Sequence, residues 1–146
     1  MSVGTRFSLL AAALLCTATA SFAAPEQYLY HDHSSPALID ADSAAAIWKA
    51  QVDDDMRARI QKLYPVSKWG FISQVQGGFT PEKACVVTAR VLMVPRIVGS
   101  RLLFRPNKSA TAFATLAGAT QEQCRDLAAA KLKEAVLAMR SSLIAG

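Results

Sequence analysis

Apolar residues recur at spacings of three and four between Ser43 and Tyr64, and this period predicts one amphipathic helix. Asp42 or Ser43 can cap its start, and Pro65 ends it because proline has no backbone N–H to donate. On the opposite face, acidic residues precede arginines by four positions, which predicts a solvated, ion-paired surface. The apolar positions are Trp48, Val52, Met56, Ile60 and Leu63, and the expected ion pairs are Asp53 with Arg57 and Asp55 with Arg59.

Beyond that helix the apolar period shortens to two, which predicts β-strands. A first strand leads from Trp69 to a turn at Gly77-Gly78, and a second runs from Ala84 to Val94. A short strand over Arg101 to Arg105 and another over Ser109 to Leu116 follow, each after a turn signal. One side of the second strand is an unbroken apolar row, which consists of Cys85, Val87, Ala89, Val91 and Met93.

The C-terminal segment predicts a second helix, whose start is marked by a capping box of Thr120 and Gln123. The order of helix, three or four strands joined by tight turns, and helix is typical of an α+β domain. We therefore expect residues 42–146 to form a three- to four-stranded antiparallel sheet with both helices packed on one face. The apolar stripe of the last helix contains Cys124, Leu127, Ala128, Leu132, Ala135, Val136, Met139 and Leu143.

The first residues follow the three-part pattern of a bacterial-type secretory signal: a basic Arg6, an uncharged run from Phe7 to Ala20, and a cleavage site at Ser21-Phe22-Ala23 with small residues at its first and last positions. We expect residues 1–23 to be a cleaved signal peptide, which places the mature chain in the periplasm or outside the cell. The alternative is an uncleaved membrane anchor, but the run is shorter than the ~20 apolar residues of a spanning helix. Every later apolar run is interrupted by charge, so we expect no transmembrane segment after cleavage.

Residues 24–41 show no helical period, and we expect them to form an extended or flexible lead-in. This segment contains both histidines of the chain, His31 and His33, on either side of Asp32. In an extended chain alternate residues point to the same side, so the two imidazoles could together hold a copper, nickel or zinc ion. A complete metal site needs further ligands. Metal binding is therefore the alternative to a solvated arm, and no cofactor is expected.

Signal cleavage leaves two cysteines in a compartment where disulfides persist. Cys85 and Cys124 both fall in apolar, core-facing rows, so we predict a disulfide between the second strand and the last helix. Two buried free thiols or a redox pair are the alternatives. A redox pair is disfavoured because the chain has no Cys-x-x-Cys spacing that would lower a thiol pKa.

Charge is distributed unevenly along a chain whose formal net charge is +5. Residues 24–56 hold seven acidic residues and one basic one, whereas residues 83–121 hold six basic residues and no acidic one. We predict a basic β-hairpin surface in which Arg90, Arg101 and Arg105 bind a partner, with Arg101 and Arg105 on one strand face. Alternatively, these charges only balance the acidic first helix within the same molecule.

Catalytic patterns are weak. Asp53, Asp54 and Asp55 fan apart on a helix, and no Gly-x-Ser-x-Gly elbow is present. We therefore expect an exported non-enzymatic module that binds an envelope protein or an anionic envelope polymer. Nucleic acid is not an expected partner, because export separates the two and no recognition motif occurs. The alternative function is a small metal-binding protein or hydrolase that uses the His31-Asp32-His33 segment.

Overall fold

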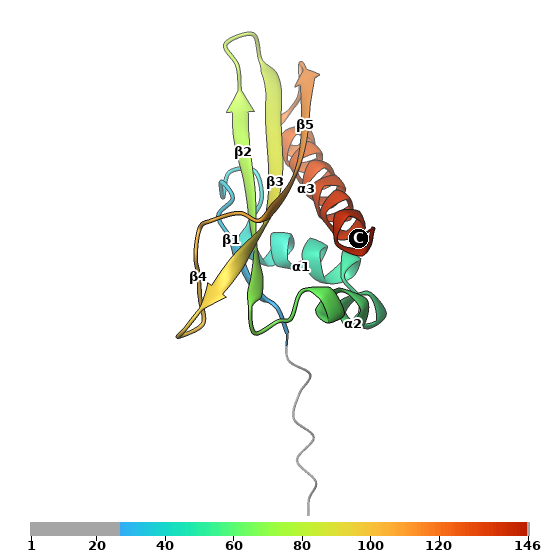
Figure 1. Cartoon of the computed structure of the whole chain (residues 1–146). Helices are drawn as coiled ribbons and strands as arrows, with labels where there is room; N and C mark the ends of the chain where they lie inside the picture. The colour runs from blue at the N-terminus through green and yellow to red at the C-terminus, as the bar shows by residue number, and fades with distance from the viewer. Residues whose placement is uncertain (1–26, 146) are drawn as a thin grey trace, which may run out of the picture.

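Three helices and five strands make up residues 27–145, the part of the chain that the computed structural model describes (Figure 1). The expected signal peptide, residues 1–23, lies outside these residues. Within them, no helix is long and apolar enough to cross a membrane. The mixed α and β content agrees with the predicted class. The elements are β1 (Leu29–Asp32), α1 (Ala41–Gln51), α2 (Asp54–Leu63), β2 (Trp69–Phe79), β3 (Ala84–Ile97), β4 (Arg101–Leu102), β5 (Lys108–Ala117) and α3 (Gln121–Ile144).

The sheet is mixed, so the prediction of a purely antiparallel sheet was wrong. β2, β3 and β5 pair antiparallel in succession, and β4 pairs with the C-terminal end of β3. β1 pairs parallel with β2, with Leu29 opposite Gly70 and Asp32 opposite Ser73. Parallel neighbours need a crossover connection, and α1 and α2 supply it. Part of the expected extended or flexible lead-in is thus the edge strand β1.

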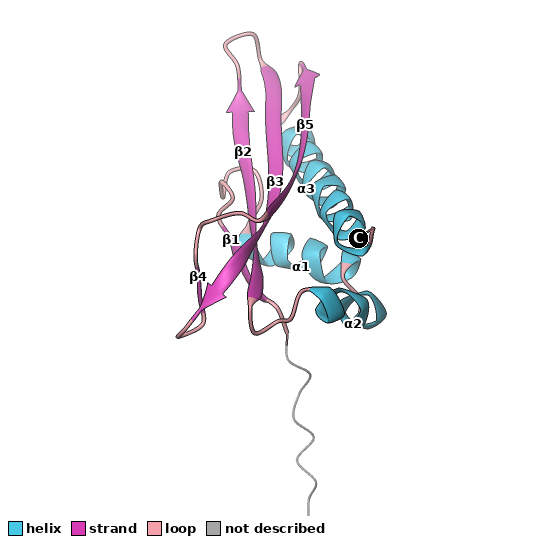
Figure 2. Ribbon diagram, viewed as in Figure 1, coloured by secondary structure: helices cyan, strands magenta, loops and turns pink. Residues whose placement is uncertain are grey.

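The main core lies between the sheet and the helices α1 and α3, which cover one face of it (Figure 2). The apolar row predicted on β3 and the apolar stripe predicted on α3 meet there. Trp48 of α1 reaches the same face, because its ring lies 4.5 Å from that of Phe71 on β2. The predicted capping box is present at the start of α3, where Thr120 accepts from the backbone of Gln123. We call this side the helix face and the opposite side the outer face.

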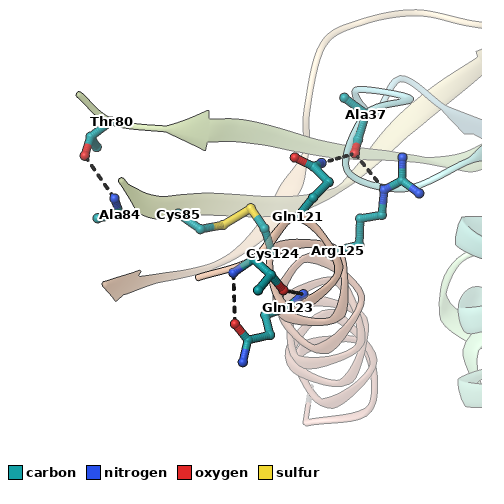
Figure 3. The surroundings of a disulfide bond; sticks show 9 residues. Ala37, Thr80, Ala84, Cys85, Gln121, Gln123, Cys124 and Arg125 are labelled. Carbon is teal, nitrogen blue, oxygen red and sulfur yellow. Dashed lines mark hydrogen bonds between the residues drawn. A yellow bond between two sulfur atoms is a disulfide. The ribbon is translucent and has the colours of Figure 1, made fainter. Parts of the chain in front are cut away.

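A disulfide joins Cys85 of β3 to Cys124 in the first turn of α3, with their Cα atoms 5.7 Å apart (Figure 3). Both cysteines are fully buried in the main core. Nearby, Gln121 and Arg125 each donate a hydrogen bond of 3.2 Å to the carbonyl oxygen of Ala37, in the loop between β1 and α1. The start of α3 is therefore tied both to the central strand and to this loop.

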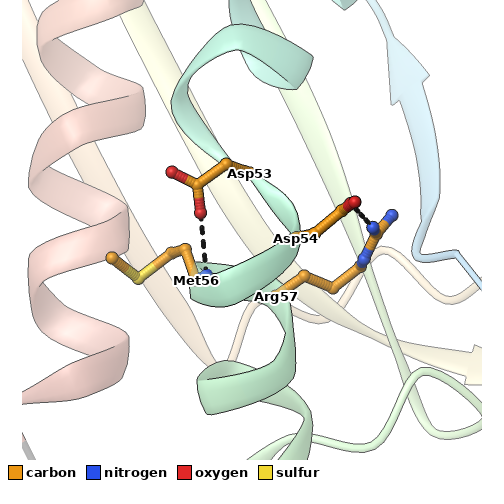
Figure 4. A network of polar contacts seen from close by, with 4 residues as sticks. All are labelled: Asp53, Asp54, Met56 and Arg57. Atoms are coloured by element: carbon orange, nitrogen blue, oxygen red, sulfur yellow. Dashed lines mark hydrogen bonds and ion pairs between the residues drawn. The ribbon is translucent and has the colours of Figure 1, made fainter.

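The single helix predicted over Ser43 to Tyr64 is in fact two helices, α1 and α2. The chain breaks between them because the carboxylate of Asp53 caps α2, accepting a hydrogen bond of 2.8 Å from the backbone N–H of Met56 (Figure 4). Since this carboxylate is used as a cap, the side chain of Arg57 pairs with Asp54 instead of Asp53. The apolar period continued across the break, so it did not reveal the second cap.

A second, smaller core lies on the outer face. Ile72 of β2 and Leu92 and Val94 of β3 are buried there, and Leu102 of β4 packs against them. Residues 98–107, which we call the β4 arm, therefore fold back over this end of the outer face. The strand predicted over Arg101 to Arg105 was too long, because β4 has only two residues.

Candidate functional site

One row of polar side chains crosses the open part of the outer face. The register places Gln74 of β2 opposite Arg90 of β3, and Arg90 opposite Thr111 of β5. On the other side of Gln74, the backbone N–H of His33 donates a hydrogen bond of 2.8 Å to the carbonyl oxygen of Ser73. This bond continues the parallel register beyond β1 and places His33 beside Gln74. The same row therefore contains His33 and Arg90, which are far apart in the sequence and are separated in the sheet by Gln74.

The two histidines lie on the outer face, but Asp32 does not join them. The rings of His31 and His33 are both exposed, with their centroids 6.5 Å apart. The carboxylate of Asp32 instead accepts hydrogen bonds from the hydroxyl groups of Ser73 and Ser34. In the part of the chain covered by the structure, no group of three or more His, Cys, Asp or Glu residues could hold a metal ion. The expected two-imidazole pair is thus present on one face, but without a third ligand from this segment.

The Asp32 carboxylate belongs to a hydrogen-bond network that fastens β1 to β2. Ser73 is a fully buried polar residue, and its hydroxyl group lies 2.6 Å from the hydroxyl of Tyr30. The Tyr30 ring stacks on Trp48 with 5.5 Å between centroids. A buried hydroxyl without a partner would cost free energy, so this network explains why a serine is tolerated inside the sheet. These residues are therefore used in holding the fold.

We expect the protein to lose stability as the pH rises above about 10, the ordinary pKa of tyrosine. Burial raises the pKa of Tyr30 to about 12, with the charge of Asp32 adding to the effect and the Ser73 hydrogen bond opposing it. Burial also raises the pKa of Tyr28. As the pH rises, the tyrosines of the unfolded chain lose their protons before those of the folded protein. The stabilisation is therefore fully present below the pKa of tyrosine in the unfolded chain, and it is lost as the pH rises towards the pKa of the folded state. Denaturant titrations at neutral and alkaline pH measure this loss. The Tyr30→Phe variant should show a shallower decline, and an equally steep one would contradict the assignment.

The three predicted binding arginines are all exposed. Arg90 stands on the outer face of β3, Arg101 on β4 opposite Ile97, and Arg105 in the β4 arm. Because β4 ends at Leu102, the prediction that Arg101 and Arg105 share one strand face was wrong. Arg90 thus lies on a long strand of the sheet, whereas Arg101 and Arg105 both lie in the β4 arm, which packs on the same sheet.

Two other basic residues of this region have structural contacts. The guanidinium of Arg96 donates a hydrogen bond of 3.1 Å to the carbonyl oxygen of Val66. The ammonium of Lys108 donates one of 3.3 Å to the carbonyl oxygen of Ser142. Lys108 also lies 5.7 Å from the centre of the Tyr64 ring. The remaining arginines, Arg90, Arg101 and Arg105, have no acidic partner between residues 27 and 145, where the ion pairs are Arg57 with Asp54 and Lys131 with Glu134.

Sequence reasoning missed the apolar side chains that the β4 arm exposes beside its arginines. Val98 is 94% exposed, and Leu103 and Phe104 are also exposed. Ile97, at the end of β3, continues this apolar surface. Their position next to the turn at Gly99-Ser100 was the available signal, because apolar residues in a turn are seldom buried. Neighbouring exposed apolar groups indicate an interaction surface more strongly than isolated ones do.

A pocket of about 360 Å³ lies on the other side of the molecule, between β1, α1 and the start of α2. Its lining includes the rings of Tyr28, Tyr30 and Trp48 and the side chain of Arg57. Arg57 is already paired with Asp54, and Tyr30 is part of the network with Ser73. The lining also includes the side chains of Asp53, which caps α2, and Asp54, the partner of Arg57.

Comparison with known proteins gives no family assignment. No protein-family model matches the chain, and no curated protein matches it. Among solved structures, a "putative lipoprotein" from Caulobacter crescentus CB15 has 9% sequence identity and a TM-score of 0.35, covering 78% of this chain and 88% of that chain. PelC from Paraburkholderia phytofirmans, solved as a dodecamer, has 10% identity and a TM-score of 0.35, covering 75% of this chain and 87% of that chain. Likeness at this level carries no argument about what this chain does.

Proposed function

We propose that this chain is an exported, non-enzymatic interaction module that binds an anionic macromolecule of the cell envelope through Arg90, Arg101 and Arg105. One observation carries the proposal: these guanidinium groups are exposed, and none has an acidic partner within residues 27–145. The acidic residues around α1 and α2 lie on the side of the main core, where Asp40 and Asp53 serve as helix caps. The sheet therefore stands between the two charge groups, which weakens the view that they only neutralise each other.

The chemistry of the surface suits an anionic partner. A guanidinium is planar and carries parallel N–H donors, so it binds carboxylate, sulfate or phosphate groups with two hydrogen bonds. Arg101 and Arg105 lie within the β4 arm, which also exposes Val98 and Phe104. Apolar contacts beside charged ones favour a partner that presents acidic groups on a less polar framework. The positive net charge of the chain would also accelerate its encounter with a polyanion.

The alternative metal-binding function is best tested by point substitutions, not by deleting the lead-in. β1 is a strand of the sheet and Tyr28 belongs to the main core, so removing residues 24–36 would damage the fold itself. The variant His31→Ala, His33→Ala changes only two exposed side chains. An interaction module should keep its affinity for an anionic partner in this variant, whereas a metal-binding protein should lose its affinity for copper or nickel ions.

We expect the variant Arg101→Glu, Arg105→Glu to bind an anionic polymer at least about tenfold more weakly than the wild type, and Arg90→Glu to add to the loss. Binding to a carboxylated polysaccharide such as alginate, with neutral dextran as the blank, measures the effect. The wild-type affinity should also fall with added salt, because screening acts over about 10 Å at ordinary ionic strength. Stability should change by no more than about 1 kcal/mol, since exposed charges contribute little.

A matched control is available on α2. Arg59 and Lys62 are exposed, and the variant Arg59→Glu, Lys62→Glu changes the net charge by the same amount. This control should keep most of the wild-type affinity. Equal loss in both variants would mean that only net charge matters, and an affinity indifferent to salt and to the reversal at Arg101 and Arg105 would reject the proposal.

A further inference from the structure

β5 forms an exposed edge of the sheet, and after its first residue, Lys108, it has none of the charges or prolines that usually protect such an edge. In the described part of the chain it pairs with β3 alone. The sequence from Ser109 to Gln121 contains no charged residue and no proline. At the middle of the strand, Phe113 is 76% exposed. Natural edge strands are commonly protected by charges, proline, bulges or short length, because an unprotected edge pairs with another strand. β5, with ten residues, is suited to such pairing.

The residues at the centre of β5 read the same in both directions: Thr111-Ala112-Phe113-Ala114-Thr115. Antiparallel strands run in opposite directions, so a palindromic strand meets its own sequence in a second copy. A two-fold symmetric interface requires this kind of self-complementary surface. The palindrome therefore indicates a second copy of this chain as the partner of β5.

The hydrogen-bond pattern of the sheet leaves the right backbone groups free. In antiparallel pairs, residues that exchange hydrogen bonds alternate with residues whose N–H and C=O point away from the partner strand. The backbone N–H of Gly118 donates a hydrogen bond of 3.2 Å to the carbonyl oxygen of Lys83, so these two residues form a hydrogen-bonded pair. Counting from this pair, every second residue of β5 is hydrogen-bonded to β3. Thr111, Phe113 and Thr115 then direct their N–H and C=O groups away from β3. No other element within residues 27–145 makes a backbone hydrogen bond to these three residues.

We propose that β5 pairs antiparallel with β5 of a second copy of this chain, about a two-fold axis at Phe113, and joins the two sheets into one. Each Phe113 ring would then face its symmetry mate on the outer face, and Thr111 would face Thr115. Aromatic and threonine pairs directly across strands are favourable. α3 packs on β3 and β5, so its two copies would lie about two strand spacings, or ~10 Å, apart, near the distance at which helices pack.

The inference goes beyond the proposed function and does not depend on it. If both hold, however, the dimer has a consequence for binding. Arg90 lies opposite Thr111 on the adjacent strand, so the two copies of Arg90 would stand on one continuous outer face, on either side of the axis. Two arginine surfaces on one rigid sheet would bind a repeating polyanion more tightly than one surface does, through effective concentration.

Sedimentation of the exported chain, without any polymer present, tests the proposal. We expect a concentration-dependent dimer in the wild type. Phe113→Lys should weaken dimerisation by about tenfold or more, because it places two ammonium groups opposite each other at the axis. The matched control is Phe104→Lys, which makes the same change at an exposed phenylalanine of the β4 arm and should dimerise like the wild type. A wild type that stays monomeric at the highest concentration, or a Phe113→Lys dimer of wild-type affinity, would overturn the proposal.

A cross-linking variant keeps the test valid if the lysine disturbs folding. Hydrogen-bonded antiparallel pairs have Cα atoms about 5.5 Å apart, which is within the range of a disulfide. Phe113→Cys should therefore give a covalent dimer under oxidising conditions, seen on a non-reducing gel and lost on reduction. Phe104→Cys should stay mainly monomeric. Equal cross-linking of both variants, or no cross-linking of Phe113→Cys, would count against the two-fold axis at Phe113.

Discussion

Replacing both half-cystines by alanine, in the variant Cys85→Ala, Cys124→Ala, should lower the free energy of unfolding by ~4 kcal/mol. The disulfide closes a loop over a sequence separation of 39 residues, and the chain-entropy model gives this figure for such a loop. Small domains are stabilised by only about 5 to 15 kcal/mol in total, so the loss is a large part of the whole. Guanidinium titration of the oxidised wild type and the variant measures the difference.

The double variant is preferable to a single one, because a lone buried cysteine could form disulfides between chains. The free energy of unfolding of the variant should also fall more steeply with denaturant concentration, since the unfolded chain without the cross-link exposes more surface. Wild type treated with a reductant should approach the variant in stability. Two titratable thiols in the unreduced, unfolded wild type, or a stability loss below about 1 kcal/mol in the variant, would contradict the stabilising role of the bridge.

We expect Gly77→Ala to destabilise the protein by more than ~3 kcal/mol, through a contact that no side-chain movement can relieve. Gly77 lies on β2 opposite Val87, with a positive φ of 142°. A Cβ atom there would lie 1.9 Å from the carbonyl oxygen of Val86 and 2.9 Å from its carbonyl carbon. Because the obstructing atoms belong to the backbone of β3, the two strands would have to separate at this point.

The adjacent Gly78 supplies the matched control. It also has a positive φ, of 154°, but a Cβ atom there would meet nothing within 4 Å. Gly78→Ala therefore carries only the conformational penalty, on the order of 1 to 3 kcal/mol. Both substitutions restrict the unfolded chain equally, so the difference between the two free energies of unfolding reports the backbone contact. Equal losses in denaturant titrations of the two variants would show that Gly77 is required only for its φ angle.

Local sequence patterns predicted the elements whose apolar residues face a single core. The apolar row from Cys85 to Met93 and the stripe of α3 were readable because every second residue of a strand, and every third or fourth of a helix, must be buried there. The same two patterns predicted the disulfide, since both cysteines had to point into that core. The capping box at Thr120 is likewise a local hydrogen-bond pattern, and the sequence predicted it correctly.

Local patterns did not predict features that depend on partners distant in the sequence. The break between α1 and α2 interrupts no apolar period, because the faces of both helices still meet the same core. β1 gave no strand pattern, since its half-buried Asp32 is satisfied by Ser73, 41 residues away. β4 is short because the chain returns to β3 soon after it, where the backbone N–H of Asn107 donates a hydrogen bond to the carbonyl oxygen of Met93.

Sequence by itself determined which chemical groups are available: the uneven distribution of charge, the arginines of a basic segment, and the palindrome centred on Phe113. Only the tertiary structure decided how these groups are arranged. The register brings Arg90 into one row with Gln74 and Thr111, and the order of the strands makes β5 an edge. The physical reason is that charge and propensity belong to each residue, whereas strand order and register are set by the burial of both sheet faces at once.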